Sequence, residues 1–401
     1  MRRFFIFLLL IGTLAACGSD SATDTKKLLV AWAGEGDLFV WRSGEETQRI
    51  AEGNIVRVLI SPDAEQIAFT RCIEMDCAED SLWIIGVDGS DERQISVQPY
   101  LRQIAWGDAN TLAYNTLELA AIGDFPRDDL TLVDVATGEQ TALELGGKFE
   151  FSPDGTYLAL IDPGSYQDQP GRIQVLPVLG EVEPVTLLDY PSVSSGAHSP
   201  FFPAIYWEDN ATFRVTIPGA DVIYHEFDGL AQPVALWRVS LDGTTEQLGN
   251  VDSSYFGLPM WSADMSAILY LQRSDADPGL FDLWLADGDG ANAVLVVSQQ
   301  VANDVPYPIW IGATNTFLYP QDNSYWIGAP GESPRRWWVG DDRLLTSTHQ
   351  VAGASLVTIA LRHDTIELRV ADLNDSSGES QLITEGASGL FFDVIELNLI
   401  N

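Results

Sequence analysis

A short turn pattern recurs along the chain and constrains the fold more than any other feature. Each copy has a large apolar residue, a polar turn that includes Ser-Pro-Asp at 61–63 and at 152–154, and then a second apolar stretch. The copies recur at intervals of 45 to 56 residues, and a repeat of this size indicates a repeat architecture. The apolar residue that precedes each turn is Ile60, Trp106, Phe151, Trp207, Trp261 or Trp310.

A second landmark follows further along each repeat. It is an apolar strand that ends in a glycine-containing turn, and Asp-Gly at 88–89, 242–243 and 287–288 suits a tight hairpin because glycine tolerates positive φ. A short polar strand follows each turn. The eight copies span residues 37–44, 81–89, 130–138, 172–180, 235–243, 282–290, 324–331 and 366–375.

Together the landmarks predict an all-β chain of four-stranded antiparallel units, which is the pattern of propeller blades. Eight hairpin copies predict eight blades, with seven as the alternative because the inner strand near 346–353 is a weak copy. The first repeat lacks its inner strand, while the last is followed by an extra apolar stretch at 391–400. We expect this C-terminal strand to complete the first blade and close the ring, which removes exposed sheet edges.

The amino terminus has the pattern of an export signal. Met1-Arg2-Arg3 is basic, residues 4–14 are apolar, and Leu14-Ala15-Ala16-Cys17 resembles a bacterial lipobox. The resemblance implies a signal peptide at 1–16, a lipid such as palmitate on Cys17, a flexible tether at 17–26 and a single propeller domain at 27–401. It also implies an exported protein anchored at the periplasmic face of the outer membrane or at the cell surface. The alternative is an ordinary signal peptide with an incidental cysteine.

The charge balance limits the partners. The formal net charge is −37, from 58 acidic and 21 basic residues, and such a chain repels nucleic-acid phosphates. We interpret the acidic residues as a solvated, self-repelling surface that favours a monomer, with binding of calcium or a cationic ligand as the alternative. Nothing in the sequence calls for a cofactor.

Two further cysteines lie close together. Cys72 and Cys77 occur in an exported context, where paired thiols usually form disulfides. A metal site would need more cysteine or histidine ligands nearby, and the sequence has none there. We therefore predict a structural disulfide between Cys72 and Cys77.

The turns Ser61-Pro62-Asp63 and Ser152-Pro153-Asp154-Gly155 resemble those of TolB-type, WD-like propeller repeats. The resemblance covers nearly the whole chain after residue 26, with Trp261-Ser262-Ala263-Asp264 as a partial copy. It implies the fold and says little about function, because such repeats occur in a periplasmic Tol-system protein, in prolyl-oligopeptidase-like enzymes and in many lipoproteins. We expect this chain to depart from both named groups, because the residues around its repeats predict neither an α/β domain nor a hydrolase domain.

The sequence shows no catalytic motif. There is no Gly-x-Ser-x-Gly nucleophile motif, the four histidines have no zinc spacing, and no glycine-rich phosphate loop is present. The run Asp287-Gly288-Asp289-Gly290 falls in the hairpin-turn slot, which explains it better than calcium binding does. A glycosidase-type pair of carboxylates in the propeller channel remains open, because no feature selects one.

The unequal loops point to a binding face. The long segments lie at residues 71–80, 115–129, 162–171, 188–204, 218–234 and 271–280, and all of them are expected on one face of the ring. Long loops on a rigid scaffold are common sites of binding. Aromatic and polar side chains on these loops are candidate ligand-binding residues: Arg127, Tyr166, Tyr190, His198, Phe202, Tyr224, His225, Phe227 and Arg273.

These observations favour an envelope-anchored, non-enzymatic propeller that binds a protein, peptide or glycan on its long-loop face. A carbohydrate-active hydrolase or lyase that uses channel carboxylates is the first alternative. A structural component of a Tol-like envelope complex is the second.

Overall fold

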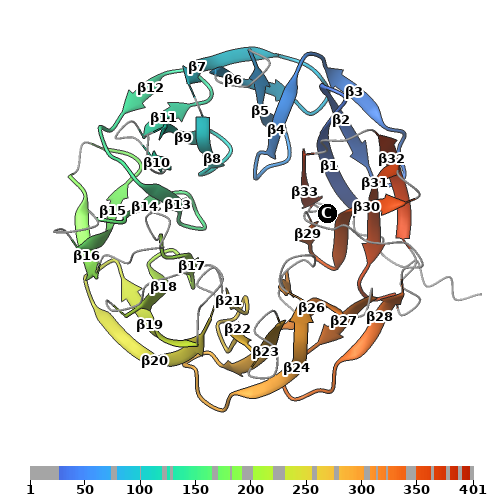
Figure 1. The fold of residues 1–401 in the computed structure, drawn as a ribbon. Helices are drawn as coiled ribbons and strands as arrows, with labels where there is room; N and C mark the ends of the chain where they lie inside the picture. The colour runs from blue at the N-terminus through green and yellow to red at the C-terminus, as the bar shows by residue number, and fades with distance from the viewer. Residues whose placement is uncertain are drawn as a thin grey trace, which may run out of the picture.

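The structure is a computed structural model, and its strands form a closed ring (Figure 1). The described residues contain strands and turns, and none of them forms an α-helix. The described residues are 27–73, 79–99, 101–119, 124–126, 130–164, 170–180, 183–191, 202–219, 231–254, 260–274, 280–301, 308–312, 315–321, 324–339, 349–362, 365–375, 380–386 and 391–397.

Within these ranges, no helix has the length and apolar character needed to cross a membrane.

Eight antiparallel sheets form the eight blades, which confirms the predicted fold. From the centre outward, blade 1 contains β33 (Phe391–Leu397), β1 (Lys27–Gly34), β2 (Asp37–Arg42) and β3 (Gln48–Ala51). Blade 2 contains β4 (Ile55–Ile60), β5 (Gln66–Cys72), β6 (Glu79–Gly86) and β7 (Arg93–Pro99). Blade 3 contains β8 (Leu101–Trp106), β9 (Thr111–Leu119), β11 (Thr131–Asp134) and β12 (Gln140–Ala142), and the added short strand β10 (Asp124–Pro126) pairs with β9.

The next blades repeat the same order. Blade 4 contains β13 (Lys148–Phe151), β14 (Tyr157–Asp162), β15 (Gly171–Pro177) and β16 (Val185–Tyr190). Blade 5 contains β17 (Ile205–Trp207), β18 (Thr212–Pro218), β19 (Gln232–Ser240) and β20 (Thr245–Ser253). Blade 6 contains β21 (Met260–Trp261), β22 (Ala267–Arg273), β23 (Leu280–Asp287) and β24 (Val294–Val301).

The last two blades complete the ring. Blade 7 contains β25 (Ile309–Ile311), β26 (Thr316–Gln321), β27 (Ser324–Gly328) and β28 (Arg335–Val339). Blade 8 contains β29 (His349–Ala352), β30 (Ser355–Arg362), β31 (Thr365–Asp372) and β32 (Ser380–Gly386). Strand β29 falls on the weak inner copy near 346–353, so the blade count is eight and the seven-bladed alternative is wrong.

The C-terminal strand closes the ring as the sequence predicts. Strand β33 pairs with β1 from Lys27 opposite Leu397 to Ala33 opposite Phe391. The side-chain amide of Gln350, on β29, donates to the Phe392 carbonyl at 3.0 Å and accepts from the Val394 amide at 3.2 Å. Blade 8 and blade 1 are therefore joined by hydrogen bonds as well as by packing.

The recurring Ser-x-Asp turn has a defined hydrogen-bond pattern. In the copy at 152–157, the Ser152 hydroxyl donates to Asp154 at 2.7 Å and accepts from the Tyr157 amide at 3.0 Å. Gly155 follows with φ of 70°, and its amide donates to the Ser152 carbonyl at 2.8 Å. The same serine-to-aspartate bonds form in the copies at 61–63 and 262–264, at 2.6 and 2.8 Å. The motif is thus a structural turn, because its polar groups satisfy one another.

Two of the inner-strand tryptophans, Trp106 and Trp310, connect neighbouring blades by hydrogen bonds. The Trp106 indole donates to the Leu59 carbonyl at 3.2 Å, and the Trp310 indole donates to the Met260 carbonyl at 2.8 Å. Both acceptors lie on the inner strand of the preceding blade. A large apolar ring with one polar N–H suits this position, because the ring packs between sheets while its N–H finds a backbone partner.

The core is distributed between the blades, because the two faces of each sheet pack against its neighbours. Between blades 3 and 4, for example, Leu130 and Leu132 of blade 3 pack with Phe149, Leu158 and Leu176 of blade 4. Cys72 is 9% exposed at the end of β5, while Cys77 lies outside the described residues. The disulfide between them stays a prediction.

Candidate functional site: the long-loop face

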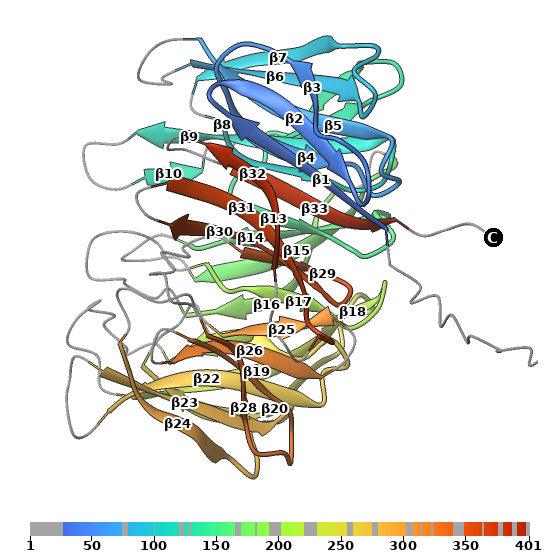
Figure 2. The ribbon, with the colours of Figure 1, turned by 90° about the vertical axis from the view of Figure 1, so that its right-hand side faces the viewer.

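The connections between strands divide the ring into two faces. On one face, here called the turn face, the fully described connections are short, as at 61–65, 152–156 and 262–266. Strand β16 ends at Tyr190 and β18 ends at Pro218 on the opposite face, here called the long-loop face. Figure 2 shows β9 and β10 projecting on the long-loop side at the left, while β33 runs to the turn side at the right.

Six of the nine predicted ligand-binding residues lie outside the described residues, and their roles remain predictions. They are Arg127, Tyr166, His198, Tyr224, His225 and Phe227. The other three, Tyr190, Phe202 and Arg273, lie at the long-loop side of blades 4, 5 and 6.

Tyr190, the last residue of β16, is a packing residue. It is 2% exposed, and its hydroxyl donates to the Asp162 carbonyl at 3.0 Å. Its ring fills the space beside Gly171, where an added Cβ would lie 2.2 Å from the ring. Burial, together with the charge of Asp162, raises the pKa of the phenol well above its usual range. Tyr190 therefore supports the base of a long loop and offers no free surface to a ligand.

Phe202 precedes β17 and forms a contact between two blades. The Lys148 ammonium lies 5.0 Å from the centre of its ring. Lys148 is the first residue of β13, so this cation–π contact joins the inner strand of blade 4 to the residues just before the inner strand of blade 5, at the long-loop side. The pair presents a half-buried aromatic ring and a cation, which is a combination that suits a peptide or glycan.

Arg273 ends β22 and has a donor that the protein leaves unused. Its guanidinium lies 5.7 Å from the Phe281 ring, and its backbone amide donates to the Ser254 hydroxyl at 2.9 Å. The Nε atom is buried and has no hydrogen-bond partner. Buried polar atoms almost always have partners, so a donor without one is a candidate for contact with a ligand.

Asp80, which the sequence did not single out, has the complementary feature. It lies at the long-loop end of β6, is 5% exposed, and its Oδ1 atom has no hydrogen-bond partner. Burial raises the pKa of this carboxyl, and the nearby Arg57 charge opposes the shift. Asp80 and Arg273 are the two charged residues with such an atom in the part of the chain that the structure describes. The sequence does hold a signal for Asp80, because it is an acidic residue at a strand position whose side chain is expected to be buried.

The inner strand of blade 4 carries a second polar group. Glu150 has an exposed side chain, but the surrounding protein removes part of its hydration, and this loss raises the pKa of its carboxyl. The positive charge of Lys148 acts in the opposite direction and lowers that pKa. Tyr206 of β17 lies nearby, and burial together with the Glu150 charge raises its pKa to about 12. A carboxyl with a raised pKa can act as a general acid.

A second carboxyl at the ring centre has a structural role. Oδ2 of Asp393, on β33, accepts a hydrogen bond from the Ile60 amide at 2.7 Å and so joins the closing strand to blade 2. Oδ1 accepts from the amide of Val394, the next residue of the same strand, at 2.9 Å. Among the described residues, no group of three or more histidine, cysteine or acidic side chains is placed to hold a metal ion.

In sequence, no family model and no curated protein matches the chain. Similar folds occur among solved structures. A prolyl endopeptidase is 14% identical over 85% of this chain, with a TM-score of 0.54, and the match spans 50% of that enzyme. An oligogalacturonate lyase in complex with manganese is 13% identical over 88% of this chain and 98% of its own, with a TM-score of 0.50.

TolB from Acinetobacter baumannii is also similar, at 13% identity over 91% of this chain and 82% of TolB, with a TM-score of 0.38. At these identities the comparisons show the propeller fold alone. The prolyl endopeptidase and the oligogalacturonate lyase differ in activity, so the shared fold does not identify an activity for this chain.

Proposed function

We propose that this chain is an envelope-anchored lipoprotein whose propeller is a non-enzymatic scaffold for a protein, peptide or glycan bound on the long-loop face. The supporting observation is that two charged residues at the long-loop ends of blades 2 and 6, the buried Asp80 and the half-buried Arg273, each have a buried polar atom with no partner in the protein. A bound ligand would supply those partners. The Phe202–Lys148 contact adds an aromatic surface on the same side.

The chain ends agree with this arrangement. Lys27 lies opposite Leu397 where β1 begins and β33 ends, and this end of both strands is at the turn face. A tether formed by residues 17–26 would therefore leave from the turn face and reach at most about 36 Å. A lipid on Cys17 would hold the turn face nearer the membrane and direct the long-loop face away from it.

Selective blocking of one face tests the binding proposal. The substitutions Asp189→Cys, at the long-loop end of β16, and Thr245→Cys, at the turn-face end of β20, each place a thiol at an exposed position. Each thiol is coupled to a polyethylene glycol chain, and the proteins are used to capture partners from native membranes. We expect the Asp189 conjugate to lose most of the captured material and the Thr245 conjugate to retain it. Equal capture by the two conjugates would contradict the proposal.

Metabolic labelling tests the anchor separately. Cys17→Ser should abolish incorporation of labelled palmitate and release the protein from the membrane fraction. Ser19→Ala, in the same segment, is the matched control and should leave both unchanged. Palmitate incorporation that survives Cys17→Ser would show that Cys17 is not the lipidated residue, while leaving the binding face open.

A carbohydrate-active enzyme is the second candidate, and the raised pKa of Glu150 at the ring centre favours it. Oligogalacturonate is a suitable probe, because it is the substrate named for one protein of similar fold. A lyase would release an unsaturated product that absorbs ultraviolet light. Turnover that Glu150→Gln abolishes would establish the enzyme, whereas the scaffold proposal expects no turnover by either protein.

A further inference from the structure

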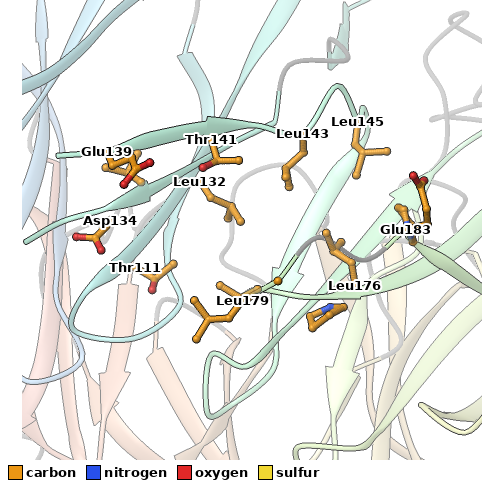
Figure 3. A pocket seen from close by; sticks show the side chains of 15 residues that line it. Thr111, Leu132, Asp134, Glu139, Thr141, Leu143, Leu145, Leu176, Leu179 and Glu183 are labelled. Carbon is orange, nitrogen blue, oxygen red and sulfur yellow. The ribbon is translucent and has the colours of Figure 1, made fainter. Parts of the chain in front are cut away.

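A groove of about 750 Å³ lies on the outer part of the ring between blades 3 and 4 (Figure 3). Its volume falls within the range of about 300–1,000 Å³ that is typical of ligand sites. The glycine turns of the two blades contribute to it, so it lies at the turn side and is separate from the long-loop face.

The groove has leucines along its length. Figure 3 shows Leu143 and Leu145 on one wall, and Leu176 and Leu179 opposite them. Leu179 is 86% exposed, which is the highest exposure among the large hydrophobic residues that the structure describes as exposed. Exposure of so much apolar surface to water is unfavourable in free energy, and burial of Leu179 by a partner would remove that cost. This surface is therefore suited to contact with apolar side chains.

Carboxylates stand at the two ends of the leucines. Asp134 and Glu139 lie at one end in Figure 3, and Glu183 lies at the other. The lining residues include no lysine, arginine or histidine. Glu139 and Glu183 form no ion pair with the part of the chain that the structure describes. The groove is therefore complementary to an occupant with an apolar centre and positive charges on both sides.

The edge of blade 3 borders this groove. Strand β12 is the outermost strand of its sheet, and no described strand covers its outer edge. The Asp134 amide donates to the Glu139 carbonyl at 2.9 Å, and the Leu143 amide donates to the Leu130 carbonyl at 2.9 Å. Because bonding alternates along a strand, the backbone groups of Gln140 and Ala142 face outward. An extended chain could pair with that edge while its side chains enter the groove.

We propose that this groove binds an extended segment of a partner protein in which two or three apolar side chains are flanked by lysine or arginine. The apolar side chains cover the leucines, and the basic side chains pair with Glu139 and Glu183. A second copy of this chain fits less well, because its net charge of −37 opposes self-association at an acidic site. An anionic lipid surface is repelled for the same reason.

Three labelled peptides probe the groove with the purified full-length chain. The first is Lys-Lys-Leu-Val-Leu-Lys-Lys. The second replaces its apolar centre with Ser-Thr-Ser, and the third replaces its lysines with glutamates. We expect measurable binding of the first peptide by fluorescence anisotropy and binding at least about tenfold weaker for each of the others. Equal binding of the first two would overturn the proposal, because it would show attraction by net charge alone.

Paired variants locate the site. We expect Leu179→Ser and Glu183→Lys each to weaken binding of the first peptide by about fivefold to tenfold. The matched controls are Leu295→Ser, at a 49% exposed leucine of β24, and Glu246→Lys, at an exposed position of β20. They should leave the affinity unchanged. Because Leu179 is so exposed, its replacement leaves the core intact, which unchanged thermal unfolding would verify.

Three outcomes would overturn the proposal: native affinity in both groove variants, equal loss in the controls, or a Leu179-dependent dimer in light scattering. Cosedimentation with phosphatidylcholine vesicles that depends on Leu179 would also overturn it and assign the surface to lipid. None of these outcomes bears on the long-loop face, so the two proposals fail independently.

Discussion

Replacement of Gly155 by alanine tests how neighbouring blades depend on the recurring turn. Gly155 has φ of 70°, a left-handed conformation that costs an L-residue about 1–2 kcal/mol. A Cβ atom there would also lie 2.4 Å from the carbonyl oxygen of Gly107, in the adjoining turn of blade 3. Both turns would have to shift, and overpacking of this kind costs about 1–3 kcal/mol. We therefore expect Gly155→Ala to lower the free energy of unfolding by about 2–5 kcal/mol.

Gly243 provides the matched control. It has φ of 88°, and an added Cβ would meet no atom within 4 Å. Gly243→Ala should therefore cost only the conformational part, about 1–2 kcal/mol. The same turn position as Gly155 is occupied by Ala64 with φ of 60°, and Ala64→Gly should stabilise the protein by up to about 1 kcal/mol.

Guanidinium unfolding followed by tryptophan fluorescence measures these differences. The midpoint should fall further for Gly155→Ala than for Gly243→Ala. Equal shifts in the two variants would refute the claim that close contact between the turns of blades 3 and 4 requires glycine at position 155.

Three further substitutions test the hydrogen bonds that join the blades and form the turns. Arg214→Met should cost about 3 kcal/mol in chemical unfolding, because Arg214 donates from blade 5 to the carbonyls of Met265 at 2.8 Å and Gly288 at 3.0 Å. Gln350→Ala should speed hydrogen exchange in β33 at least about tenfold, because two bonds to that strand are lost; unchanged exchange would count against its role in closure. Hydrogen bonds from Ser152 and Thr156 hold the pKa of Asp154 below its ordinary 3.8, so the stability they give is present above that pH and lost below it. Asp154→Ala should therefore lower the Tm at pH 7, and its difference from the native protein should shrink as the pH falls below the ordinary value of 3.8.

The sequence predicts the fold well because the blades repeat the same order of strands and short turns. The Ser-x-Asp turn forms the same hydrogen bonds in blades 2, 4 and 6, and tryptophans such as Trp310 recur on inner strands, so the repeat can be seen in the sequence. The eight hairpin turns then give the number of blades. The closing strand at 391–397 is predictable because the first repeat lacks an inner strand.

The site is predicted less completely, because it depends on contacts between residues far apart in the sequence. Tyr190 is of a residue type common in binding sites, but its ring is buried beside Gly171 and its hydroxyl donates a hydrogen bond to the Asp162 carbonyl. Asp80 belongs to no sequence motif. What distinguishes it is a buried carboxylate oxygen with no hydrogen-bond partner, and only the structure shows this. The groove at Leu179 forms only where the turns of two blades meet.

Photocrosslinking in living cells tests the binding face most directly. A benzophenone amino acid is placed at position 189 on the long-loop face or at position 245 on the turn face, both of which carry exposed side chains. We predict a discrete partner or glycan adduct from position 189 and none of the same mass from position 245. The same adduct from both positions, or from position 245 alone, would contradict the assignment of the long-loop face as the binding surface.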